Sequence, residues 1–258
     1  MKPLAGRTAL VTGGTRGIGA AVSEKLVNWG AHVTAGYVDN ARAASALQKQ
    51  LGEQLALAEA DISTAAGAQE LVQQALTDAG ALDILIHCAA AASYGNATEL
   101  TDKQWNFTRA TTLDSLRYLA EAATEPLSRS KHGRLIAISN TMPHRIVPGG
   151  AALAVAKAGV ETLTRYLAYE LAPYGVVVNA IQPGLVMTDV LKVRPQYAHT
   201  HAQERSASPW PGNRTTTAKD VAHVAAALCL DEMGWMSGQV IPVDGGASQW
   251  GWLGERHA

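Results

Sequence analysis

The stretch Val11-Thr12-Gly13-Gly14-Thr15-Arg16-Gly17-Ile18-Gly19 joins an apolar run to an amphipathic one through a glycine-dense turn. The preceding residues Thr8-Ala9-Leu10-Val11 predict a buried strand, and residues 17–29 carry apolar side chains at helical intervals. Glycines let the backbone approach a pyrophosphate closely, and the free N–H groups of the following helix attract its charge. The stretch therefore predicts a phosphate-binding turn. A tight turn without a ligand is the alternative, because the spacing differs from G-x-G-x-x-G.

Composition and charge narrow the class of protein further. The 258 residues carry 21 basic and 22 acidic side chains spread without blocks, for a net charge of −1. This balance argues against nucleic acid or an anionic membrane as a partner. Cys88 and Cys229 lie far apart without metal-ligand neighbours, which indicates a reducing compartment and neither a disulfide nor a metal site. We expect a cytoplasmic protein, since residues 1–7 lack a signal-peptide core and no run has membrane-spanning length.

The remaining sequence alternates apolar runs with amphipathic segments. Strands are expected at residues 8–11, 32–36, 55–58, 83–87, 134–138, 176–181 and 239–243. Helices are expected at residues 17–29, 41–51, 66–79, 102–125, 151–171 and 218–230, with Pro126 ending the fourth of them.

This strict alternation predicts an α/β fold, a Rossmann-like, doubly wound parallel sheet of about seven strands. No linker divides the chain, so we expect a single domain over residues 1–258. Ligands in such sheets bind at the carboxyl ends of the strands, where the strand order reverses. The loops after strands one, four, five and six should meet there, and residues 191–217 should form a substrate lid.

Several motifs together resemble the short-chain dehydrogenase/reductase (SDR) family over essentially the full length of the chain. They are Thr12-Gly13-x3-Gly17-Ile18-Gly19, Asp61 after strand three, Lys157-Ala158-Gly159-Val160, Asn179-Ala180-Ile181-Gln182-Pro183-Gly184 with Thr188, and Ser237-Gly238-Gln239 followed by Val243-Asp244-Gly245-Gly246.

The resemblance implies a nicotinamide cofactor and roles for individual residues. Asp61 would bind the adenine, Lys157 the nicotinamide ribose hydroxyls and Thr188 the carboxamide. The glycine turn would hold the pyrophosphate and adenosine. The implied cofactor site comprises Gly13, Arg16, Gly17, Ile18, Gly19, Tyr37, Asp61, Ala89, Lys157, Pro183, Gly184 and Thr188.

The choice between NADP(H) and NAD(H) depends on the end of strand two. An acidic residue there normally accepts the adenosine ribose hydroxyls and selects NAD. In this chain the position is Tyr37, while Arg16 stands where it could neutralise a 2′-phosphate. We therefore favour NADP(H). NAD(H) stays possible because Asp39 is close by.

The residues at the family's catalytic positions differ from those that the family usually has. The family's tyrosine lies four residues before the lysine, and here that position is Leu153. The family's serine position is Asn140, because Ser139 should point the other way along its strand. The helix asparagine aligns with Thr112. No usual proton donor for an alkoxide therefore stands in the usual place.

These changes favour conjugate reduction of an α,β-unsaturated carbonyl, such as an enoyl thioester, over ketone reduction. The resulting enolate needs hydrogen-bond donors on its oxygen, and water can protonate its α carbon. Asn140 and Thr112 would polarise that oxygen, Lys157 would orient the ribose, and His144 is the candidate acid. His144 could equally be an exposed loop histidine, and Tyr94 is a further candidate.

Two other functions fit the same sequence. A catalytically silent subunit could pair with an active homologue, and a redox-neutral biosynthetic enzyme could use the same cleft. The family's long helices, here residues 102–125 and 151–171, usually pack subunit on subunit. The resemblance thus implies a homotetramer or a homodimer.

Overall fold

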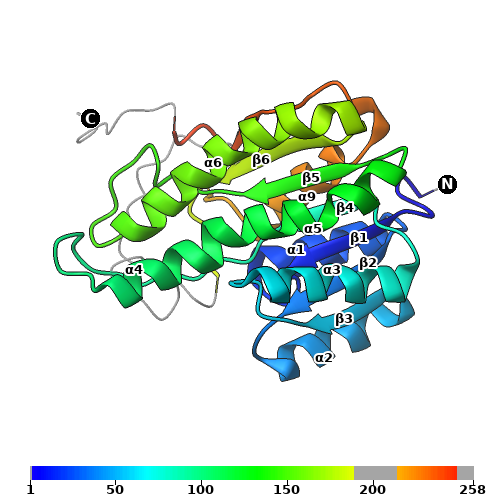
Figure 1. The fold of residues 1–258 in the computed structure, drawn as a ribbon, viewed down its shortest axis with the longest axis horizontal. Coiled ribbons are helices and arrows are strands. Elements are labelled where there is room, and N and C mark those ends of the chain that lie inside the picture. The colour runs from blue at the N-terminus through cyan, green and yellow to red at the C-terminus, as the bar shows by residue number, and fades with distance from the viewer. Residues whose placement is uncertain (1, 189–213, 249–258) are drawn as a thin grey trace.

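The computed structural model describes residues 2–188 and 214–248, and it contains a parallel sheet covered by helices on both faces (Figure 1). The strand order is β3-β2-β1-β4-β5-β6-β7. All strand pairs are parallel, as expected when a helix connects consecutive strands. The predicted α/β, Rossmann-like, single-domain fold is confirmed.

The elements follow the expected alternation. The strands are β1 (Thr8–Thr12), β2 (His32–Tyr37), β3 (Leu55–Glu59), β4 (Ile84–His87), β5 (Arg134–Ile138), β6 (Val177–Pro183) and β7 (Val240–Val243). The helices are α1 (Gly17–Asn28), α2 (Ala41–Leu51), α3 (Ala65–Ala79), α4 (Asp102–Arg109), α5 (Ser115–Arg129), α6 (Ala151–Leu171) and α9 (Ala218–Leu228).

Two apolar clusters fill the space between the sheet and its helices. Helices α1 and α9 pack with one face of the sheet around Val11, Leu26 and Val221. Helices α3, α5 and α6 cover the other face around Leu10, Leu119 and Val160, and they lie in front of the sheet in Figure 1. The central strands are buried on both faces, so they read as continuous apolar runs.

The segment expected as one helix over 102–125 differs from expectation in two ways. A π-helical turn, Ala110–Asp114, separates α4 from α5. Helix α5 then continues through Pro126 to Arg129, so the prediction that Pro126 ends the helix was wrong. Pro126 lies in the last turn and is buried together with Leu127, and this packing offsets the hydrogen bond that proline removes.

The strand order reverses between β1 and β4, where their carboxyl ends open a crevice. Residues 191–213 of the expected substrate lid lie outside the described residues. Within the described part of the chain, none of the helices is long and apolar enough to cross a bilayer.

Candidate active site

The turn between β1 and α1 is built so that only glycine fits at several of its positions, three of which shape the site. A Cβ on Gly19 would lie 2.0 Å from the carbonyl oxygen of Gly13, which is a collision. Gly13 has φ +60° and lies against Ala89, whose Cα would be 3.1 Å from an added Cβ. Gly17 has φ +57° and lies against Thr188. The turn therefore brings the loops after β4 and β6 to the start of α1, as the sequence predicts.

The N-terminus of α1 has the features of an anion site. Arg16 occupies the N-cap in extended conformation without a capping hydrogen bond from its side chain, and the first turn carries no acidic residue. The N–H groups of Gly17, Ile18 and Gly19 precede the first intrahelical bond, donated by Ala20 to Arg16 O (3.1 Å). Exposed N–H groups and the helix dipole attract phosphate oxygens, so this end of α1 fits a pyrophosphate.

Positively and negatively charged side chains lie close together at the end of β2. Arg16 and Asp39 approach to 3.6 Å, and both side chains are more than half exposed. Partial burial and the neighbouring Glu59 carboxylate raise the pKa of Tyr37. Asp61, exposed after β3, accepts a hydrogen bond from Ser63 N (3.0 Å) through one carboxylate oxygen. A ribose 2′-phosphate would thus meet Arg16 only by competing with Asp39.

Lys157 is buried on α6 and donates to the carbonyl oxygen of Ile138 (2.5 Å) at the end of β5. Burial lowers the pKa of Lys157 to about 8, an effect that nearby Cys88 and Glu161 partly oppose. An ammonium has three N–H donors, and one of them is used by Ile138. The other donors suit the vicinal hydroxyls of a ribose, so the residues present fit a nicotinamide nucleotide.

A hydrogen-bonded cluster lies one helical turn beyond Lys157. Ser139 donates its hydroxyl to Glu161 Oε1 (2.7 Å), and His144 Nε2 lies 2.8 Å from Glu161 Oε2. The Ser139 side chain is therefore directed at α6. The sequence analysis missed Glu161. The available signal was a charged residue at the i+4 position after Lys157, on the same face of α6.

The other predicted catalytic residues are also engaged. Asn140 Oδ1 accepts a hydrogen bond from Met142 N (2.9 Å). Thr112 is buried in the π-helical turn and donates its hydroxyl to Ala91 O (3.0 Å), which ties α4 and α5 to the loop after β4. The hydroxyl proton of Thr112 is therefore directed at the protein backbone.

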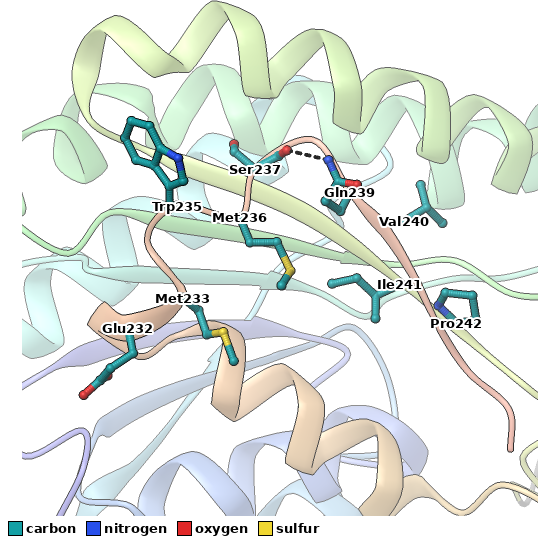
Figure 2. A pocket seen from close by; sticks show the side chains of 9 residues that line it. All are labelled: Glu232, Met233, Trp235, Met236, Ser237, Gln239, Val240, Ile241 and Pro242. Atoms are coloured by element: carbon teal, nitrogen blue, oxygen red, sulfur yellow. Dashed lines mark hydrogen bonds between the residues drawn. The ribbon is translucent and has the colours of Figure 1, made fainter.

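A pocket of about 320 Å³ lies beside the start of α6. It is lined by residues 95–97, by residues 145–151 and by Met142 and Ala154. Gly95 N donates to Gly149 O (3.0 Å), which joins the two loops that form it. A second pocket, of about 590 Å³, lies along the edge strand β7, where Met236 and Ile241 face each other (Figure 2). The first pocket adjoins the first turn of α6, the helix that carries Leu153 and Lys157.

Comparison with known proteins agrees with this geometry. Residues 13–248 match the family described as "Enoyl-(Acyl carrier protein) reductase". The chain is 32% identical over 242 residues to the 3-oxoacyl-(acyl-carrier-protein) reductase of Haemophilus influenzae, covering 93% of this chain and 98% of that protein. It is also 32% identical over 240 residues to the acetoacetyl-CoA reductase of Shinella zoogloeoides, covering 93% and 98%.

A solved structure gives the same assignment. The short-chain dehydrogenase/reductase from Serratia marcescens superposes with a TM-score of 0.87 at 30% identity, covering 95% of this chain and 99% of that one. The chain belongs to the short-chain dehydrogenase/reductase family. It is accordingly an oxidoreductase, and its SDR relatives use NAD(H) or NADP(H).

One further feature of this SDR chain is a buried histidine at the end of β4. His87 Nε2 lies 2.8 Å from Ser115 Oγ, and the Ser115 hydroxyl donates to Thr111 O (2.8 Å). The Ser115 oxygen must then accept from His87 Nε2–H, which leaves Nδ1 without a proton. Burial, together with the charge of Lys157, lowers the pKa of His87 to about 3. His87 is thus neutral and packs against α5.

Proposed function

We propose that the chain is an NADP(H)-dependent reductase with an atypical active site, acting on an α,β-unsaturated carbonyl such as an enoyl thioester, or on a ketone. The observation that carries this proposal is the pair Leu153 and Lys157. Lys157, to which the family resemblance assigns the nicotinamide ribose, is buried and donates to Ile138 O, and the residue one helical turn before it is a buried leucine with no proton to donate. The name of the matching family and the names of the relatives favour an acyl-thioester substrate.

The absence of a phenol at position 153 favours a C=C bond over a C=O bond as the group reduced. In conjugate reduction a nicotinamide cofactor, when bound, would supply the hydride that adds to the β carbon. The electron pair of the C=C bond would then form a double bond between the α carbon and the carbonyl carbon, and the carbonyl pair would move to the thioester oxygen to give an enolate. The enolate then takes a proton at the α carbon from water or a side chain. A ketone would instead give an alkoxide, which needs a donor held on oxygen.

The residues around Lys157 can serve these steps. Asn140 accepts from Met142 N–H with Oδ1, so its amide nitrogen is the end that can donate to a substrate oxygen. Lys157 orients the ribose, and His144 supplies the proton from the cleft mouth. Thr112 contributes by fixing the loop after β4 through Ala91.

The pocket beside α6 gives a place for the apolar part of such a substrate. Met142, Val147 and Ile146 contribute apolar surface to it, as binding pockets for acyl chains require.

Helix α6 also presents Tyr166 and Tyr169, which are 62% and 84% exposed, on its outer side. This surface supports the proposal of a homotetramer or homodimer, because large exposed apolar side chains mark interaction sites.

The test begins with cofactor binding. Pure, cofactor-stripped protein is titrated with NADPH and NADH, following tryptophan fluorescence and confirming by calorimetry. Tighter binding of NADPH is expected. Turnover of enoyl and 3-oxoacyl thioesters is then followed by the loss of NADPH absorbance, and faster turnover of the enoyl substrate is expected.

Other outcomes would contradict the proposal in distinct ways. Binding without turnover, together with copurification of a tyrosine-bearing homologue, would identify a silent subunit. Turnover of a substrate without cofactor consumption would identify redox-neutral chemistry. Binding of neither nucleotide would show that the glycine turn is purely architectural.

A further inference from the structure

Helix α6 carries an ionisable residue one turn after Lys157, whereas the family places its ionisable residue one turn before the lysine. Leu153, Lys157 and Glu161 follow one another at intervals of four residues and are all buried. Residues at this spacing lie on one face of a helix. The apolar side chain therefore precedes the lysine, and a carboxylate follows it.

Glu161 is a buried charge with both oxygens engaged. It is 4% exposed, Ser139 donates to Oε1, and His144 Nε2 meets Oε2. A buried carboxylate is costly unless hydrogen bonds and an opposite charge compensate it. Ser139 supplies only a neutral hydroxyl. Among the described residues, His144 meets Glu161 directly, and Lys157 lies one helical turn before it on α6.

We propose that Glu161 is a positioning residue of the reaction site, which anchors the His144 imidazole and keeps Lys157 in its ammonium form. The inference rests on the proposed reductase function, in which His144 and Lys157 act on substrate and cofactor. The trio Ser139, Glu161 and His144 is not a hydrolase triad, because the hydroxyl donates to the carboxylate and not to the imidazole.

The surroundings of Lys157 explain why it needs a counter-charge. The groups that face it are the Ile138 carbonyl from β5, the Cys88 thiol and the neutral His87 from the end of β4, and Glu161 from α6 itself. Burial raises the pKa of Cys88 to about 12, so its thiol is neutral at pH 7. Glu161 is the only carboxylate among these four groups.

The side chains of this cluster and of Lys157 differ in their exposure to solvent. Ser139, Glu161 and Lys157 are 3%, 4% and 4% exposed, whereas the side chain of His144 is 58% exposed. His144 can therefore exchange protons with water while Glu161 holds its ring in place. The cluster thus links bulk water to the neighbourhood of the reaction site, although the usual tyrosine is absent.

The variant Glu161→Gln tests the proposal. Glutamine keeps the shape and can still bond Ser139, but it removes the charge. We expect the titration midpoint of Lys157, followed by NMR of lysine labelled at its ε carbon and assigned with Lys157→Met, to fall by about one pH unit. The upper pH limit of NADPH binding should fall in parallel. Glu170→Gln, an exposed position on the same helix, is the matched control and should leave both unchanged.

A second variant tests the link to His144 without touching the buried carboxylate. His144→Gln should lower turnover at least tenfold and flatten the pH profile of kcat, while NADPH binding stays as in the wild type. His223→Gln, an exposed histidine on α9, is the control. An unchanged Lys157 midpoint in Glu161→Gln, or an unchanged pH profile in His144→Gln, would overturn the proposal.

The two proposals fail in distinguishable ways. The NMR titration of Lys157 needs neither substrate nor turnover. A shifted midpoint in a protein that reduces no carbonyl compound would contradict the reductase function alone. An active reductase with an unshifted midpoint would contradict the role of Glu161 alone.

Discussion

Restoring a tyrosine at position 153 should give this chain a proton donor that it lacks. Leu153 is 9% exposed and one helical turn before Lys157, whose pKa of about 8 leaves about ten ammonium ions for each neutral amine at pH 7. That charge lowers the pKa of a nearby phenol. General acid catalysis contributes about 10²–10⁴-fold, so ketone reduction by Leu153→Tyr should rise at least about 100-fold.

The control is Leu153→Phe, which adds the same ring without the hydroxyl. Overpacking at this buried position costs about 1–3 kcal/mol in both variants, so their Tm values should fall together. The assay compares kcat for NADPH-dependent reduction of a 3-oxoacyl thioester and of an enoyl thioester. Enoyl reduction should change little, because its enolate is protonated at carbon. Equal ketone reduction by the two variants, both folded and binding NADPH, would refute the reasoning.

Four further variants concern the cofactor half of the site. Arg16→Ala should weaken NADPH binding by about 10–100-fold with little effect on NADH, and Asp39→Asn should tighten NADPH binding, both measured by calorimetry. Gly19→Ala should abolish nucleotide binding or folding, checked by circular dichroism and calorimetry, because its Cβ would lie 2.0 Å from Gly13 O. Lys157→Met should remove a rise in stability that the wild type shows between about pH 8 and 10.5, measured by urea unfolding at several pH values. The folded-state pKa of Lys157, about 8, lies below its ordinary value of 10.5, so the unfolded wild-type chain binds more protons in this range and the stability of the wild type rises with pH.

The sequence predicted the features that depend on local pattern. Strand and helix alternation and the glycine turn follow from periodicity and from the resemblance, and residues near in sequence build them. The Glu161 cluster could not be predicted this way. It joins α6 to the residues after β5, which lie 17 and 22 positions away in the sequence. Only the packing of helix on sheet brings them together.

Proline and the π-helical turn show a second limit of sequence patterns. Pro126 is a strong helix terminator in isolation, yet tertiary packing keeps α5 intact to Arg129. The π-helical turn at 110–114 contains no glycine or proline from which it could have been predicted. The resemblance aligned the helix asparagine with Thr112, and Thr112 lies within this turn. Pattern reasoning assumes a regular helix, and the assumption fails there.

The π-helical turn has a consequence for how this region can change in evolution. A π turn accommodates one residue more than a regular helix over the same length. Deleting a single residue there would restore an unbroken α-helix while α4 and α5 keep their orientation. The widened backbone that brings Thr112 to Ala91 O would be lost, whereas Ser115, which follows the turn, would stay beside His87. One codon would therefore change this side of the cleft locally and leave the sheet and both helices in place.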